Sequence, residues 1–312
     1  MGTETKSLQN NRIAYLDYLR VLAMFAIIVP HVSAQYFYDA DVYGLDWHLL
    51  NIMNGVTRWV VPVFLMISGT LFLGRDIPIK KVYTKYVSRM AVSFLVWSTI
   101  YSLFADTNLL GRIVIIIKGH YHLWFVLMMI GVYMLMPLVR PFAENETRLK
   151  YYLVLALVFA LILPQASTMA RDFGNESIIN GFDAIDSAVG HMTVKLVLGY
   201  VAYFVLGYYI SKNEQTKKQR IVIYILSILS YIATIALNSA VALKTGKYCE
   251  TYYGSFTVNI MLEGLGIFVL FKHLNLKPNK IIQTLSKYGF GVYLVHVLII
   301  INSATKYHKL LL

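Results

Sequence analysis

The sequence predicts an all-α protein, a polytopic transmembrane helical bundle of about nine or ten helices. Of its 312 residues, 58% are hydrophobic and only 14% are charged, and the mean hydropathy is +0.59. This composition is too apolar for a water-soluble domain. Apolar runs of about 20 residues, the length that crosses a bilayer, recur along the whole chain. We therefore expect one integral membrane domain over residues 1–312, with 1–12 as a cytoplasmic tail.

The predicted spans follow one another closely in the sequence. A shorter apolar run at 109–119 is too brief to cross, so we expect it to lie at the membrane surface or to re-enter. The polar segment at 170–190 is expected to form the longest loop. The spans are expected at residues 13–36, 55–74, 88–105, 122–141, 150–169, 191–211, 221–241, 255–272 and 286–305.

Membrane topology explains the net charge of +12. If the N-terminus lies in the cytoplasm and the spans alternate, most of the 28 Lys and Arg fall at the inner ends and loops. Acidic segments such as "DADVYGLD" (39–46) and "DFGNES" (172–177) then fall outside. This pattern follows the positive-inside rule of multi-pass membrane proteins. We therefore expect a plasma-membrane location, membrane lipids around the helices and no nucleic-acid partner.

Two ionisable side chains interrupt the first span, "LDYLRVLAMFAIIVPHVSAQ" (16–35). Arg20 and His31 are eleven positions apart, so on a helix they lie within about 20° of one face and about 16 Å apart along the axis. A charge at the centre of a span costs roughly 2.5–3.5 kcal/mol on insertion scales, so such residues are functional candidates. Asp17 is close enough to pair with Arg20, and Pro30 is expected to kink the helix. The alternatives are an Arg20 that only snorkels to the inner surface and a His31 that only packs.

Further polar side chains occur in other predicted spans. Arg58 opens the second span and His296 lies well inside the last. Glu263 is a lone acid in the eighth, where a buried arginine or a proton-carrying role would account for it. Ser68 and Gly69 allow close helix packing, which explains both without any chemistry. The ionisable residues are therefore stronger candidates for a functional site than Ser68 and Gly69.

No metal site is expected. Cys249 is the only cysteine, so the chain has no intrachain disulfide and no cysteine-based metal site. His120 and His122 precede Trp124 at the start of the fourth span, where an aromatic belt is expected. Alternate residues on a helix do not share a face, so the two histidines are not expected to bind a metal together.

Five segments occur in a characteristic order along the chain. Arg20 is followed by ten residues and then His31, and later come "VPVFLMISGTLFLGR" (61–75), "HLWFVLMMIGVYMLMPLVR" (122–140), "YFVLGYYIS" (203–211) and "SKYGFGVYLVH" (286–296). In this order they resemble segments of the integral-membrane acyltransferase family called acyltransferase type 3. The resemblance covers residues 12 to about 300.

The resemblance implies a membrane O-acyltransferase. Such an enzyme moves an acyl group, usually acetyl, from cytosolic acyl-CoA to a hydroxyl of a cell-envelope glycan or lipid-linked sugar, so acetyl-CoA is the expected donor. His31 is expected to deprotonate the acceptor hydroxyl, with an acyl-histidine relay as the alternative, and Arg20 to orient the acyl-CoA. CoA phosphates are expected to pair with Lys80, Lys81, Lys85 and Arg89, although anionic lipid attracts the same side chains. The expected substrate-binding residues are Asp17, Arg58, Ser68, Gly69, Arg75, His122, Trp124, Glu263 and His296.

Two other classes of function compete with the enzyme. A transporter or exporter of an envelope component also uses buried Arg, His and Glu, and a membrane sensor or scaffold retains such a fold without activity. In many relatives one more span follows the "YLVH" segment (293–296). We therefore expect either that 109–119 crosses the membrane or that this chain is shortened.

Overall fold

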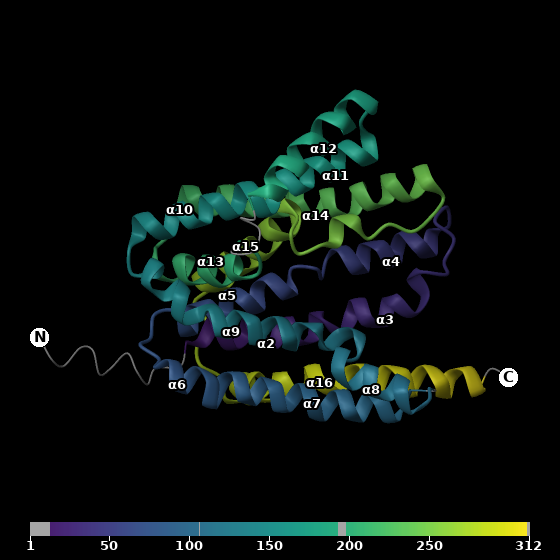
Figure 1. The fold of residues 1–312 in the computed structure, drawn as a ribbon, viewed down its shortest axis with the longest axis horizontal. Helices are drawn as coiled ribbons and strands as arrows, with labels where there is room; N and C mark the ends of the chain where they lie inside the picture. The colour runs from purple at the N-terminus through teal and green to yellow at the C-terminus, as the bar shows by residue number, and fades with distance from the viewer. Residues whose placement is uncertain (1–12, 106, 193–197, 311–312) are drawn as a thin grey trace, which may run out of the picture.

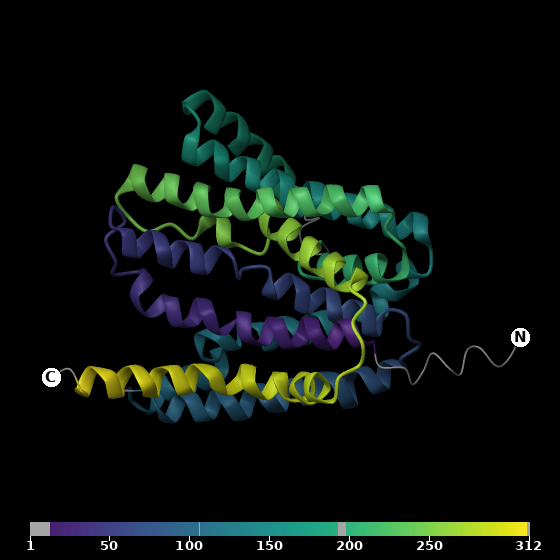
Figure 2. The same cartoon turned by 180° about the vertical axis from the view of Figure 1, so that it is seen from behind.

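The computed structural model describes residues 13–105, 107–192 and 198–310, and all regular secondary structure in these ranges is helical. Most helices run along the long axis of the molecule (Figures 1 and 2). α2 begins towards one end of this axis and α16 ends at the other, as an odd number of spans requires (Figure 1). The main helices are α2 (Ala14–Ala26), α3 (Ile28–Phe37), α4 (Leu45–Gly55), α5 (Val60–Phe72), α6 (Ile79–Lys81), α7 (Ser88–Leu103), α8 (Leu109–Lys118), α9 (Trp124–Ala143), α10 (Glu146–Ala156), α11 (Leu163–Phe173), α12 (Glu176–His191), α13 (Val201–Lys212), α14 (Lys217–Thr245), α15 (Val258–His273) and α16 (Lys280–Leu310).

Within the described residues, seven helical segments are long and apolar enough to cross a membrane. This confirms the polytopic helical bundle. Two predicted spans, 88–105 and 191–211, are not among the seven. α13 has only 12 residues, whereas α7 continues the helix that begins at Ile79 and carries Arg89 and several hydroxyl side chains. Residues 193–197 of the second lie outside the described residues. The seven segments are Ala14–Phe37, Leu45–Phe72, Leu109–Ala143, Glu146–Phe173, Lys217–Thr245, Thr251–His273 and Lys280–Ile301.

The first span is broken where Pro30 predicts a kink. Pro30 has no backbone N–H, so the carbonyl of Ala26 loses its helical donor. α2 ends at Ala26 and α3 begins at Ile28. The predicted kink is therefore confirmed, and it lies one turn before His31.

The backbones of α5 and α13 approach each other closely. A Cβ atom at Gly69 would overlap the backbone of Phe204, and a Cβ atom at Gly207 would overlap the backbone of Met66. Small residues permit this approach of two helix backbones. Gly69 is therefore a packing residue of the bundle core.

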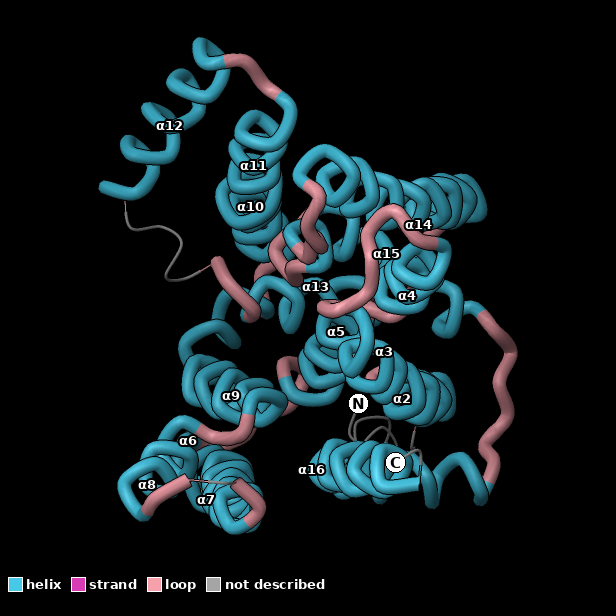
Figure 3. The backbone as a smooth tube through the Cα atoms, turned by 90° about the vertical axis from the view of Figure 1, so that its right-hand side faces the viewer, coloured by secondary structure: helices cyan, strands magenta, loops and turns pink. Residues whose placement is uncertain are grey.

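The end-on view places α2 and α3 between α5 on one side and α16 on the other (Figure 3). α2 contacts both α5 and α16, and α7 packs beside α8 and α9. The buried core joins apolar side chains of α2, α5, α9, α13 and α15. A second buried cluster joins Phe94 and Tyr101 of α7 to Tyr293 and Val297 of α16. The first cluster packs α2 with α5 and α9, and the second packs α7 with α9 and α16.

The segment at 170–190 is helical, so the loop predicted there is wrong. α11 and α12 form a hairpin in which the Asn175 side chain accepts the backbone N–H of Ile178 and caps α12. Arg171 of α11 lies 2.7 Å from Asp183 and 2.9 Å from Asp186 of α12. The charges that suggested a solvated loop therefore pair across two helices.

The short apolar run at 109–119 forms α8. Its ten residues span about 15 Å, which is too short to cross a bilayer alone. Leu109, Leu110 and Ile117 are at least 70% exposed, while α8 packs along α7. An outward apolar face of this kind is suited to lipid, both at the membrane surface and on re-entry into the membrane.

Candidate active site

A cavity of about 840 Å³ lies inside the bundle. α2, α3, α5, α9 and α16 form its wall, and the segments before α7 and after α14 complete it at the two ends. Its volume is in the range of small-molecule sites in proteins. One chamber therefore brings together side chains from the first and the last helices of the chain.

One end of the cavity is cationic. Arg20, Arg75, Arg89 and Lys287 line it there. They come from α2, the end of α5, the start of α7 and the start of α16, which lie at the same end of the bundle (Figure 1). Such a concentration of cations is suited to phosphate groups.

Asp17 holds Arg20 in place at this end. Oδ1 of Asp17 lies 3.8 Å from Nη1 of Arg20, which confirms the predicted pair. The Ser286 hydroxyl donates to the same Oδ1 at 2.7 Å. Asp17 is buried, so it needs both partners to offset the cost of burying its charge. It therefore ties the cavity face of α2 to α16 and does not itself line the cavity.

The opposite end of the cavity combines Arg58 with an acid and aromatic rings. Nη2 of Arg58 lies 2.8 Å from Oδ1 of Asn54 and 3.5 Å from Oε1 of Glu250, and its guanidinium lies 4.1 Å from the centroid of the Tyr253 ring. The Tyr38 hydroxyl donates to Glu250 at 3.2 Å. Burial and the neighbouring Glu250 carboxylate raise the pKa of Tyr38 to about 12, so its hydroxyl keeps its proton. This end offers donors, an acceptor and ring faces together.

His31 lies on the cavity wall and contacts His296 of α16. Nδ1 of His31 is 2.9 Å from Nε2 of His296 and 2.8 Å from the carbonyl oxygen of Ile27. Nδ1 of His296 is 2.6 Å from the carbonyl oxygen of Tyr293. The ring of Tyr121 lies 5.7 Å from that of His31. Two histidines that are distant in sequence thus meet as one hydrogen-bonded pair.

His122 and His120 extend the group of imidazoles, contrary to the expectation that they point apart. Their Nδ1 atoms are 3.0 Å apart. The expectation was wrong because His120 is extended and His122 lies in a short 3-10 helix (Tyr121–Leu123), so the two positions are not on one α-helix. The His122 ring lies 5.5 Å from that of His296. Among the described residues, no group of three or more His, Cys, Asp or Glu is placed to hold a metal ion.

Glu263 lies apart from the cavity in a buried polar network. The Thr234 hydroxyl donates to its Oε1 at 2.5 Å, and the Asn259 amide donates to the Thr234 oxygen at 2.7 Å. Glu263 forms no ion pair with an arginine among the described residues. Through Thr234, Glu263 joins α15 to α14, so its position favours a structural role over contact with substrate.

The other predicted site residues separate into two groups. Ser68 and Trp124 line the cavity together with Arg20, His31, Arg58, Arg75, Arg89 and His122. Lys80, Lys81 and Lys85 are exposed and do not line it. Lys85 lies over the ring of Tyr86, which does line it, at 5.8 Å. These three lysines are therefore near the cationic end but outside the chamber.

Several lining residues had no signal in the sequence. Lys287 and Ser286 are preceded and followed by ordinary helix residues, and their place on the wall depends on how α16 packs on α2. Glu250 and Tyr253 belong to a polar loop and a short turn near Cys249, where an acid and a tyrosine are unremarkable. Only tertiary packing brings these residues to Arg20 and Arg58.

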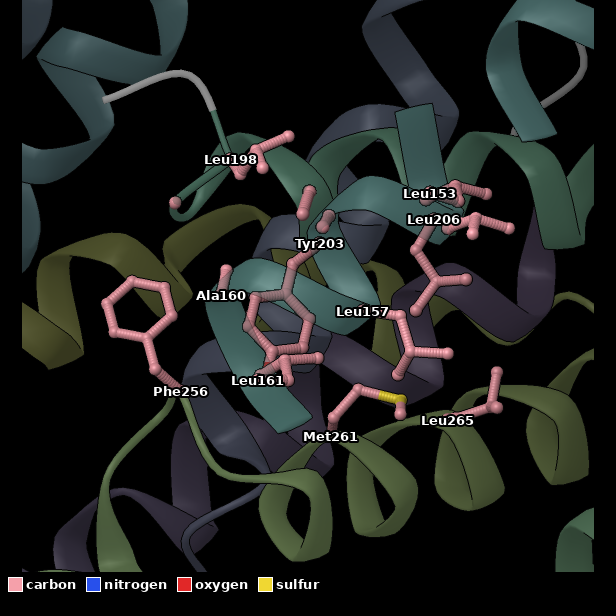
Figure 4. Close-up of a pocket in the computed structure, with 14 residues that line it drawn as sticks. Leu153, Leu157, Ala160, Leu161, Leu198, Tyr203, Leu206, Phe256, Met261 and Leu265 are labelled. Atoms are coloured by element: carbon pink, nitrogen blue, oxygen red, sulfur yellow. The ribbon is translucent and has the colours of Figure 1, made fainter. Parts of the chain in front are cut away.

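A second pocket, of about 250 Å³, lies beside the first and is lined almost entirely by apolar side chains. Leu198 and Phe256 lie at one end of it, and Leu153, Leu206 and Leu265 at the other (Figure 4). The two spaces share a partition, because Tyr200 lines the large cavity while the Phe256 ring, 4.6 Å from the Tyr200 ring, lines the apolar pocket.

Residues that are adjacent in the sequence line the two different spaces. Gly199 and Tyr200, and likewise Ser255 and Phe256, are neighbours that line different spaces. Tyr200 and Phe256 therefore lie between a cavity that carries charged side chains and a pocket that is almost entirely apolar.

Comparison with known proteins agrees with this architecture. The family model described as an acyltransferase domain, acyltransferase 3, matches residues 13–311. A search of the curated proteins and a search of the solved structures each found no match. The match covers nearly the whole chain, including all of the residues that line the cavity. The chain is a multi-pass membrane acyltransferase and belongs to the acyltransferase 3 family.

Proposed function

We propose that this acyltransferase moves an acetyl group from acetyl-CoA to a hydroxyl of a cell-envelope glycan or lipid-linked sugar. The observation that carries the proposal is the single cavity that joins a cationic end to an end built from Arg58, Glu250 and tyrosines, with His31 on the wall between. Membership of the acyltransferase 3 family favours this reading over a transporter or a scaffold. The proposed location is the plasma membrane, with the N-terminus in the cytoplasm.

The cationic end is the proposed site for the CoA phosphates. Arg20, Arg75, Arg89 and Lys287 supply charge inside the chamber. Lys80, Lys81 and Lys85 lie outside it, where they raise the local concentration of an anionic donor or contact lipid headgroups. Charge-assisted hydrogen bonds to phosphate are about twice as strong as neutral ones. Arg20 is the proposed orienting group for the thioester, because Asp17 holds it on α2, the helix that leads to α3 and His31.

His31 is the proposed general base. Its imidazole takes the proton of the acceptor hydroxyl as that oxygen attacks the thioester carbonyl carbon. The C–O bond forms, the C–S bond breaks, and CoA leaves as a thiolate that takes up the proton from His31. The alternative is a relay in which His31 first accepts the acyl group as acyl-histidine and releases CoA, and the hydroxyl then attacks that intermediate. Both routes use the same side chain on the same wall.

The end with Arg58 is the proposed site for the acceptor. Arg58, Glu250 and Tyr38 supply hydrogen-bond donors and acceptors for sugar hydroxyls, and Tyr253 and Trp124 supply ring faces. The adjacent apolar pocket supports a lipid-linked form of the acceptor, since a hydrocarbon chain there would place its polar head beside Tyr200. Phosphoryl groups of such a head would meet Arg58.

The proposed function is tested with purified protein in lipid nanodiscs. Radiolabelled acetyl-CoA is added with a cell-envelope glycan extract or with a lipid-linked sugar fraction, and CoA release and label in each product are measured. The proposal predicts that CoA release and labelled glycan or lipid-linked sugar appear together. Hydrolysis of acetyl-CoA without label in any acceptor, or no consumption of acetyl-CoA, would overturn it. Succinyl-CoA in parallel reports whether acetyl is the preferred acyl group.

A further inference from the structure

Two backbone carbonyls determine where His31 and His296 carry their hydrogen atoms. Nδ1 of His31 lies 2.8 Å from the oxygen of Ile27, and Nδ1 of His296 lies 2.6 Å from the oxygen of Tyr293. A carbonyl oxygen only accepts hydrogen bonds, so both Nδ1 atoms donate. In a neutral imidazole that donates from Nδ1, Nε2 carries the lone pair. This assignment follows from the hydrogen-bond partners of the two rings.

The contact between the two rings agrees with this assignment. Nε2 of His296 is 2.9 Å from Nδ1 of His31. A lone pair on His296 therefore faces an N–H on His31, and the His31 N–H is shared between His296 and the Ile27 carbonyl. With His296 in the other tautomer, two N–H groups would face each other. The pair thus has one arrangement of two neutral rings that satisfies all three contacts.

His296 is held firmly by the elements around it. The Tyr101 hydroxyl of α7 donates to the carbonyl of Leu294 at 3.0 Å and accepts the backbone N–H of Leu298 at 3.1 Å. The Tyr293 hydroxyl donates to the carbonyl oxygen of His122. These bonds fix the turn of α16 on both sides of His296. The orientation of the His296 ring is therefore a property of the fold.

We propose that His296 is a positioning residue for His31, an inference that rests on the proposed function. Together with the Ile27 carbonyl, it accepts the Nδ1–H of His31 and so keeps Nε2 of His31 unprotonated. Nε2 has no hydrogen-bond partner among the described residues, and His31 lines the cavity. Nε2 is thus the atom that takes the hydroxyl proton. In the resulting imidazolium, the bond from Nδ1–H to the neutral His296 strengthens and spreads the charge.

A neutral partner suits this place better than a carboxylate. His296 is buried and its neighbours Tyr293, Leu294 and Val297 belong to a buried apolar cluster. An ionised carboxylate here would carry a desolvation cost in every state of the reaction. An imidazole orients His31 without a permanent charge. The same lone pair on Nε2 of His31 serves the direct and the acyl-histidine routes, so the inference holds for either.

Two substitutions of His296 separate positioning from packing. His296→Gln keeps an acceptor oxygen that reaches towards Nδ1 of His31, whereas His296→Leu fills similar space without an acceptor. We expect kcat to fall about 10–100-fold for His296→Leu, as for other lost orienting partners, with KM for acetyl-CoA unchanged. His296→Gln should recover at least about tenfold of that loss. Equal activities of the Gln and Leu variants, both folded, would overturn the inference.

A spectroscopic measurement tests the pair without turnover. Protein labelled with 15N-histidine gives imidazole nitrogen signals that distinguish protonated from unprotonated Nδ1 and Nε2, and His31→Ala identifies the His31 signals. Wild type should show protonated Nδ1 and unprotonated Nε2 at His31. His296→Leu should show a larger share of the Nε2–H tautomer, because the Ile27 carbonyl alone then accepts the Nδ1–H. Protonated Nε2 at His31 in the wild type would contradict the inference. If no acyl acceptor is found, the proposed function fails on its own while this measurement still decides the tautomer.

Discussion

Nη2 of Arg58 lies 3.5 Å from Oε1 of Glu250 on the cavity wall, although the two residues are 192 positions apart in the sequence. The guanidinium also stacks on Tyr253 and bonds Asn54, so it is anchored on three sides. An arginine held in this way, at the end of the cavity opposite Arg20, lies at the proposed acceptor site and away from the proposed site of the CoA phosphates. Substitutions at the two ends of the cavity are therefore expected to change the KM values of different substrates.

Arg58→Ala should raise KM for the acceptor about tenfold or more and leave KM for acetyl-CoA unchanged. The reason is the loss of a charge-assisted hydrogen bond, worth about 1.5–3 kcal/mol when it is shielded from water. Steady-state kinetics with each substrate varied in turn measures both constants. The matched control is Arg171→Ala, which removes an exposed arginine outside the cavity. A rise in KM for acetyl-CoA alone would place Arg58 at the donor site instead.

Arg89→Ala should raise KM for acetyl-CoA several-fold and reduce the salt dependence of that constant. Arg89 is exposed at the cationic end, so solvent screening lowers the effect below that of a buried pair. Lys80→Ala should change KM less, because Lys80 does not line the cavity. KM measured between low and high ionic strength gives both quantities. Equal effects of the two variants would show that the donor binds to the outer surface and not in the chamber.

Gly69→Ala should destabilise the protein severely. Its added Cβ would overlap the Phe204 backbone, so α5 and α13 would have to separate, and overpacking of this kind costs about 1–3 kcal/mol or more. Gly131→Ala is the matched control, since a Cβ at Gly131 of α9 meets nothing within 4 Å. Thermal unfolding in detergent, followed by size-exclusion fluorescence, compares the two. An unchanged unfolding temperature for Gly69→Ala would contradict the close approach of these helices.

Ala202→Phe should lower transfer to a lipid-linked sugar and leave transfer to a water-soluble glycan nearly unchanged. Ala202 lines the apolar pocket, and a phenyl ring there would occupy space proposed for the hydrocarbon chain. Ala236→Phe on the exposed face of α14 is the control for a new aromatic group that faces lipid. Competition between the two acceptors in one assay measures the ratio. Equal losses for both acceptors would remove the pocket from acceptor binding.

Much of the fold is predictable from local sequence because lipid requires long apolar helices whose backbone groups bond internally. The stripe from Arg20 to His31 and the break that Pro30 causes at Ile27 depend only on helical geometry and on the chemistry of proline, and the structure contains both. The helical hairpin at 170–190 escaped prediction. Its polar and charged residues resemble those of a solvated loop in the sequence, and the ion pairs of Arg171 with Asp183 and Asp186 form only when the two helices pack together.

The assembled site is harder to predict than its parts. His31 and His296 were each singled out, but their contact across 265 positions depends on how α16 packs against α3. His120 and His122 were expected to point apart because a regular helix was assumed, and a 3-10 turn brings them together. Lys287 and Glu250 have no local signal, since a lysine in a helix and an acid in a loop are ordinary.

The most direct test of the account is transfer of label from radiolabelled acetyl-CoA to envelope glycan or lipid-linked sugar by wild type, His31→Ala and His191→Ala. His191 is an exposed histidine at the end of α12 and lies outside the cavity. The account predicts that wild type and His191→Ala transfer label equally, and that His31→Ala, present at the same level in membranes, loses at least about 100-fold of the rate. Equal transfer by all three proteins would contradict the role of His31 and with it the proposed chemistry of the cavity.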